Sequence, residues 1–102
     1  MGDGFTFALE LDELWEGEMA GVRVADRNVL LVNIDGTVHA YEDRCPHAST
    51  RLSEGELRVT TLRCASHHWE FDVVSGAGIN PRNCMLRSFE VRVVDGAVFV
   101  RL

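Results

Sequence analysis

The sequence contains no lysine, so all ten of its basic residues are arginine. Sixteen acidic residues outnumber them and give a formal net charge of -6, and six of these acids precede Arg23, the first base. An acidic surface of this kind repels nucleic-acid phosphates and anionic lipid, and it favours a protein partner with a basic face. Ordinary solubility explains the same excess of acid equally well.

Long apolar runs are also absent. No stretch approaches the roughly 20 apolar residues that a membrane-spanning helix needs. The opening segment, MGDGFTFALELDELW, has no basic n-region, no long apolar h-region and no twin arginine. We therefore expect a soluble, cytoplasmic protein without a membrane or nucleic-acid partner.

Cysteine is scarce and odd in number. Three cysteines in a chain without an export signal argue against a disulfide framework and favour a metal or redox role. The remaining composition, 46% hydrophobic and 25% charged over 102 residues, predicts one folded domain, 1–102, with a single core. No nucleophile-base pair or carboxylate dyad is evident, so we do not expect an enzyme.

The hydrophobic pattern is that of short strands. Apolar and polar residues alternate around Asp35-Gly36, within 29–41, and around Asp95-Gly96, within 88–102. Asp-Gly supplies the positive φ that a tight turn requires, so both segments are predicted hairpins. The other expected elements are strands over 20–25, 57–64 and 69–74, an edge strand over 5–9, and one helical turn near 11–15. The fold class is therefore all-β, a sandwich or a small barrel.

Two long irregular stretches remain, 42–56 and 75–86, and loops of this length in a compact β domain are usually functional. Cys45 and His47 lie in the first stretch, and Cys64 and His67 follow the next strand. The spacing is C-x-H, sixteen residues, then C-x-x-H. Because the ends of adjacent strands lie about 5 Å apart, these four side chains can converge on one site.

Three interpretations of the four residues compete. They are buried cysteines with incidental surface histidines, or a structural zinc site, or a Rieske centre. In zinc sites each turn usually carries two ligands of the same residue type, as in C-x2-4-C and H-x3-5-H. In a Rieske centre one iron of a 2Fe-2S cluster takes two thiolates and the other takes two imidazoles. Each turn here carries one ligand of each kind, and this distribution favours the third interpretation.

The sequence resembles the Rieske proteins. The residues that match the family motif are Cys45, His47, Cys64 and His67, and the further similar stretches are DELWEGEM, LSEGE, HWEF and GINPRNC. Over its whole length the chain is similar to the ferredoxins of multicomponent toluene and aromatic monooxygenases. The resemblance implies stacked antiparallel sheets, a small cluster-binding subdomain with loops at about 42–56, 64–69 and 75–86, and a Rieske-type 2Fe-2S cluster held by those four residues.

The resemblance also implies a role and partners. The chain would be a monomeric carrier that passes single electrons from an NADH-dependent flavin and iron-sulfur reductase to a diiron hydroxylase. A ferredoxin of a Rieske aromatic-ring dioxygenase system, a zinc-stabilised binding module and a small subunit of an NADH-dependent nitrite reductase remain alternatives. Respiratory Rieske proteins carry an extra cysteine in each cluster loop and an N-terminal helical anchor. This sequence has Ser49, Thr50 and Ser66 in that neighbourhood, so we do not expect quinol oxidation.

Two residues near the motif compete with its ligands. His68 adjoins His67, and only the C-x-x-H spacing selects His67. Cys84 has no partner at motif spacing and is predicted to be a packed or half-exposed thiol. His39 falls on the outward register of a predicted strand.

The remaining predictions concern packing around the cluster. Trp69 is expected to pack rather than to dock a partner. By its resemblance to the third loop of the family, the proline-containing stretch GAGINP, 76–81, is expected to cover the cluster. There Gly76 and Gly78 would allow close backbone approach, and backbone N–H groups would donate to the bridging sulfides.

Overall fold

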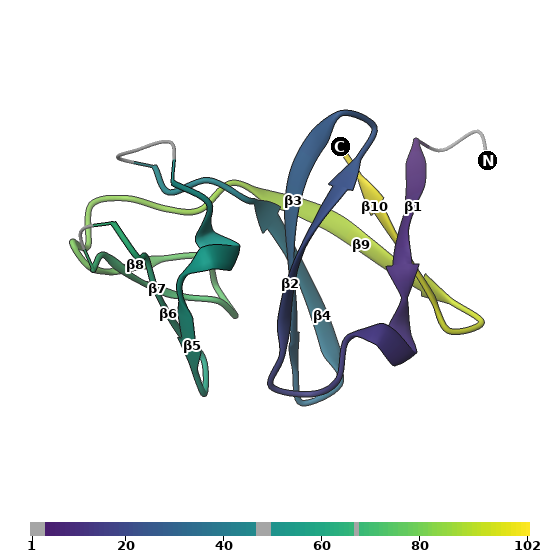
Figure 1. Cartoon of the computed structure of the whole chain (residues 1–102), viewed down its shortest axis with the longest axis horizontal. Coiled ribbons are helices and arrows are strands. Elements are labelled where there is room, and N and C mark those ends of the chain that lie inside the picture. The colour runs from purple at the N-terminus through teal and green to yellow at the C-terminus, as the bar shows by residue number, and fades with distance from the viewer. Residues whose placement is uncertain (1–3, 47–49, 67) are drawn as a thin grey trace.

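Two antiparallel sheets make up the computed structural model, which describes residues 4–46, 50–66 and 68–102. The base sheet has the order β1-β10-β9-β4-β3-β2, and a smaller sheet has the order β5-β6-β7-β8 (Figure 1). The elements are β1 Phe5–Glu10, η1 Leu11–Glu13, β2 Met19–Val24, β3 Arg27–Ile34, β4 Thr37–Glu42, η2 Leu52–Glu54, β5 Glu56–Arg58, β6 Thr61–Arg63, β7 Glu70–Asp72, β8 Gly78–Asn80, β9 Ser88–Val94 and β10 Ala97–Arg101. The all-β class is confirmed, and within these residues no helix is long and apolar enough to cross a membrane.

Both predicted Asp-Gly hairpins are present. Asp35 and Gly36 have φ of 52° and 90°, and Asp95 and Gly96 have φ of 50° and 78°. The turn between β2 and β3 has the same character, with φ of 47° at Ala25 and 67° at Asp26. This third turn was not predicted, because alanine rarely adopts positive φ.

The strand predicted over 57–64 is wrong. The chain reverses after Arg58, with φ of 55° at Val59, and forms the β5–β6 hairpin, in which Leu57 pairs with Leu62. The turn residues Val59 and Thr60 and the following Thr61 are all β-branched, a composition that is typical of a continuous strand. The stretch 75–86 is likewise less irregular than predicted, because it contains β8, which pairs with β7.

The small sheet is an insertion in the base. Its four strands all lie between β4 and β9 in the sequence, and they form the left part of the molecule in Figure 1. The base strands that flank the insertion pair at only two positions, Ala40 with Phe89 and Tyr41 with Ser88. This is the arrangement that the family resemblance implied, a small subdomain set into a larger β base.

Strand β3 separates two hydrophobic cores, whereas the composition predicted one. Val29 and Leu31 face the core inside the base, whereas Leu30 and Val32 face the core shared with the small sheet. All four side chains are fully buried. Each contributes about 1.5–3 kcal/mol of burial free energy. The small sheet is therefore packed onto the base through β3, which contributes side chains to both cores.

Candidate metal centre

Cys45 follows the end of β4 and is fully buried. Its backbone N–H donates to the carbonyl of Thr50 at 2.9 Å, and this hydrogen bond closes the first ligand loop, 45–50, at its base. Its side chain belongs to the core beneath the small sheet. The sequence produces this arrangement because an apolar strand runs directly into a polar, proline-containing turn.

Cys64 follows β6 in the same manner. It is fully buried, and its N–H donates to the carbonyl of Trp69 at 2.7 Å. The carbonyl of Cys64 accepts from the N–H of His68 at 3.1 Å, and His68 has φ of 58°. In both loops the cysteine amide therefore bonds to the carbonyl five residues later. The two loops are matched in size.

The structure brings the two predicted cysteine ligands into one core. Cys45 and Cys64 share the cluster of buried side chains with the following residues: Leu30, Val32, Tyr41, Leu52, Leu62, Phe71, Val73 and Leu86. None of the three cysteines of the chain, all of which the structure describes, is in a disulfide. His47 and His67 fall inside the two closed loops in the sequence, and both lie outside the described residues.

The third loop, 75–86, folds back on itself next to these cysteines. Gly78 donates to the carbonyl of Cys84 at 2.8 Å, and Leu86 donates to that of Gly76 at 2.8 Å. A Cβ on Gly78 would lie 2.3 Å from the Pro81 carbonyl oxygen. The glycine is thus required for contact within the loop. The N–H of Gly76 bonds to Asp72, so both glycine amides are already used, and any donors to bridging sulfides would be other N–H groups.

The structure also describes the other cysteine, histidine and tryptophan side chains that the sequence singled out. Cys84 is half-buried, and its Sγ lies 3.6 Å from the Pro81 carbonyl, as expected for a packed thiol. Trp69 is partly buried against the core, which confirms its packing role. His68 is exposed and His39 is half-buried.

Three residues that support the site carried no sequence signal. Asp43 is 3% exposed, and its carboxylate accepts from the Ser53 N–H at 2.8 Å and from the Ser53 Oγ at 2.6 Å. Tyr41, 3% exposed, donates its hydroxyl to the Val73 carbonyl at 2.6 Å. Burial and, to a lesser extent, the Asp72 carboxylate raise the pKa of Tyr41 to about 12. Polar residues at loop edges are usually exposed, so only the folded contacts identify these.

A family model described as the Rieske [2Fe-2S] domain matches residues 5–90. The chain belongs to this family. It is 45% identical over 91 residues to the alkene monooxygenase system ferredoxin component of Xanthobacter autotrophicus, covering 88% of this chain and 75% of that protein. Among solved structures, it superposes on the ferredoxin of carbazole 1,9a-dioxygenase from Nocardioides aromaticivorans with a TM-score of 0.87, 25% identity and coverage of 97% and 98%.

A second similar solved structure is a complex of reduced oxygenase and oxidised ferredoxin in carbazole 1,9a-dioxygenase. The similarity has a TM-score of 0.87 and 27% identity, and it covers 98% of this chain and 94% of that one. The shared fold extends over both sheets, because nearly the whole chain is covered. These relatives are named as ferredoxins of oxygenase systems, which are electron carriers and not the catalytic component.

The described residues fit the thiolate half of a Rieske cluster. An isolated thiolate in an apolar core is costly, and bonding to iron offsets that cost because the metal supplies the countercharge. Cys45 and Cys64 are two thiols of equal burial in one core, each at the start of a closed loop. Cys84 differs from this pair, because it is only half-buried and lies in the third loop.

Proposed function

We propose that this chain is a single-domain Rieske ferredoxin, 1–102, that delivers single electrons to an oxygenase. Cys45 and Cys64 would bind one iron of the 2Fe-2S cluster, and His47 and His67 would bind the other. The observation that carries the proposal is the pair of matched loops, which place two fully buried cysteines in a common core.

When bound, the cluster supplies a one-electron couple that is formally neutral when oxidised and carries one negative charge when reduced. The chain's own residues limit the cost of that charge change. Leu52, Phe71 and Leu86 exclude water from the side of the cysteines, and the closed loops hold the thiolates in place. A rigid, dry surrounding needs little reorganisation when an electron arrives or leaves.

We infer further that the oxygenase is the diiron hydroxylase of a monooxygenase acting on aromatic or alkene substrates, supplied by an NADH-dependent flavin and iron-sulfur reductase. The 45% identity to an alkene monooxygenase ferredoxin supports this assignment. A Rieske aromatic-ring dioxygenase is the second candidate partner, and the similarity to the carbazole dioxygenase ferredoxins supports it. The two candidates differ in the partner and not in the carrier.

The visible absorption and low-temperature EPR of the purified protein, before and after reduction by dithionite, test the cofactor. We expect two irons and two sulfides per chain and a rhombic EPR signal that appears only on reduction. A colourless, EPR-silent protein containing one zinc per chain would contradict the proposal.

Reconstitution tests the partner. The reductase and the oxygenase from the same host are assayed with NADH, oxygen and either an alkene or an aromatic hydrocarbon, with and without this chain. We expect product only when the chain is present, with a single oxygen atom incorporated. Formation of cis-dihydrodiols would transfer the assignment to a dioxygenase system.

A further inference from the structure

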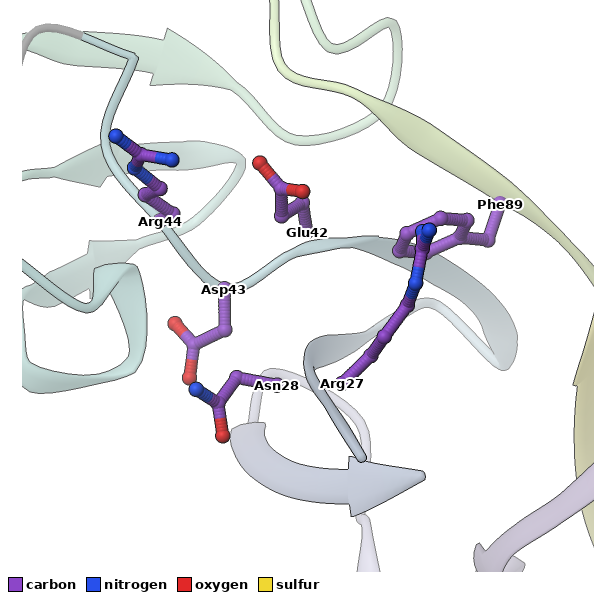
Figure 2. A pocket seen from close by; sticks show the side chains of 6 residues that line it. All are labelled: Arg27, Asn28, Glu42, Asp43, Arg44 and Phe89. Carbon is purple, nitrogen blue, oxygen red and sulfur yellow. The ribbon is translucent and has the colours of Figure 1, made fainter. Parts of the chain in front are cut away.

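A hollow of about 320 Å³ lies where the chain leaves the base sheet for the small sheet. Its lining residues are Arg27, Asn28, Glu42, Asp43, Arg44 and Phe89 (Figure 2). The Asp43 N–H donates to the Asn28 carbonyl at 2.9 Å, which joins β3 to the start of the first ligand loop. Arg44 immediately precedes Cys45, so the hollow is next to the proposed electron-transfer site.

The two arginines of the hollow differ from most others in the chain. Five arginines form ion pairs with a carboxylate: Arg23, Arg58, Arg63, Arg87 and Arg101. Within the described residues, Arg27 and Arg44 have no carboxylate oxygen within 4.0 Å, although the chain has an excess of acid. Both side chains are exposed. They are available to an external anion.

Neither of the acids that line the hollow forms an ion pair with these arginines. Asp43 is buried, and both of its oxygens accept hydrogen bonds from Ser53. Glu42 lies 3.9 Å from Nη1 of Arg87, which is outside the hollow lining. Figure 2 shows Arg27 and Arg44 on opposite sides of Glu42 in this view.

We propose that this hollow receives an Asp or Glu side chain of the terminal oxygenase, with Arg27 and Arg44 as the donors. The inference rests on the proposed function, since it concerns the docking of that carrier. Guanidinium groups recognise carboxylates by paired, charge-assisted hydrogen bonds. A chain with net charge -6 repels an acidic surface at long range, so a local basic site fixes the orientation of docking close to the cluster loop. The global charge thus predicts a basic partner, whereas the hollow predicts an acidic contact within the interface.

The test compares the double variant Arg27→Gln/Arg44→Gln with the matched control Arg23→Gln/Arg101→Gln. Both remove two positive charges and leave the same shorter, polar side chain, but Arg23 and Arg101 already have carboxylate partners and lie outside the hollow. The binding of each cluster-loaded protein to the purified oxygenase is measured by calorimetry, and electron transfer is measured by stopped-flow, over a range of ionic strength. We expect the hollow variant to raise Kd roughly tenfold more than the control does.

A third variant, Glu42→Gln, determines whether the group that enters the hollow is negatively or positively charged. Removing this negative charge should tighten binding several-fold if a carboxylate enters, and should weaken binding if a basic group enters. Equal losses of oxygenase binding in the double variant and its control, or weaker binding by Glu42→Gln, would each overturn the inference. Failure of the proposed function is distinct, because the unmodified protein would then hold no reducible cluster or would not reduce the oxygenase.

Discussion

Asp43 and Ser53 are joined by two hydrogen bonds, one from the Ser53 N–H at 2.8 Å and one from its hydroxyl at 2.6 Å. The residues lie on either side of the loop that carries Cys45, so the pair closes that loop at its base. Gly21 of β2 lies against both, since a Cβ there would be 2.5 Å from the Ser53 Oγ and 2.7 Å from an Asp43 oxygen. The first ligand loop is thereby fixed to the base sheet.

Ser53→Ala should destabilise the protein by about 1–2 kcal/mol, because the buried Asp43 carboxylate loses one of its donors. The free energy of unfolding is measured by urea denaturation, and iron per chain is measured after purification. Glu54→Ala, at the exposed next position, is the control and should change neither quantity. Equal stability in the two variants would show that the Asp43–Ser53 pair does not restrain the loop.

Gly78→Ala should open the third loop. The new Cβ would lie 2.3 Å from one backbone oxygen and 2.8 Å from another, so the loop backbone must move. We expect a loss of about 1–3 kcal/mol in stability and a changed EPR spectrum. Gly36→Asn is the control, because it lies in an exposed turn where asparagine tolerates positive φ. An unaltered spectrum would contradict the role of this loop as a cover for the cluster.

Tyr41→Phe should change the pH dependence of the free energy of unfolding at alkaline pH. The pKa of Tyr41 is raised to about 12, mainly by burial, so the phenol binds its proton more tightly in the folded chain than in the unfolded chain. This contribution is complete below about pH 10, the ordinary pKa of tyrosine, and is lost as the pH rises towards 12. We therefore expect the free energy of unfolding, measured by denaturation at several pH values, to decline less steeply above pH 10 in Tyr41→Phe than in the unmodified protein. The same pH dependence of stability in the variant and in the unmodified protein would contradict the prediction.

The ligand assignment predicts an all-or-none pattern of iron content. Alanine at Cys45, His47, Cys64 or His67 should abolish cluster binding, because each removes one bond to iron. His68→Ala and Cys84→Ala are the matched controls and should retain two irons per chain. Iron analysis and visible spectra distinguish the outcomes. Loss of the cluster in His68→Ala with retention in His67→Ala would reverse the choice between the adjacent histidines.

Raising ionic strength should slow electron delivery to the oxygenase. Charged groups steer the encounter of the partners, and salt screens their interaction over about 10 Å at 0.1 M. Stopped-flow oxidation of the reduced carrier, measured from 20 mM to 500 mM salt, checks this. A rate that is independent of salt would argue against charge-assisted docking.

Much of the architecture follows from local sequence. Asp35-Gly36 and Asp95-Gly96 predicted two hairpins because these residues accept the positive φ of a tight turn. The turn at Val59 was not predictable in the same way. Its φ of 55° is unusual for a β-branched residue, and no glycine or asparagine marks the position. Local propensity thus identified a strand where the folded chain makes a reversal.

The candidate site was predictable in part for a different reason. The spacing of Cys45 and Cys64 from their histidines is a property of sequence, and their burial in a common core accords with it. The supporting contacts are long-range. Asp43 with Ser53, Tyr41 with Val73 and Gly21 with both ends of the loop depend on how separate elements meet, so no local pattern contained them.

The position of β3 prevents the inserted subdomain from being separated from the base sheet. Leu30 and Val32 belong to the same buried core as the two cysteines, yet they precede the inserted segment and are part of the base sheet. A fragment consisting of the insertion alone would expose that apolar face and would lose the support of both ligand loops. The region from β4 to β9 is therefore not a transplantable module: a graft into another scaffold would have to supply a substitute for β3.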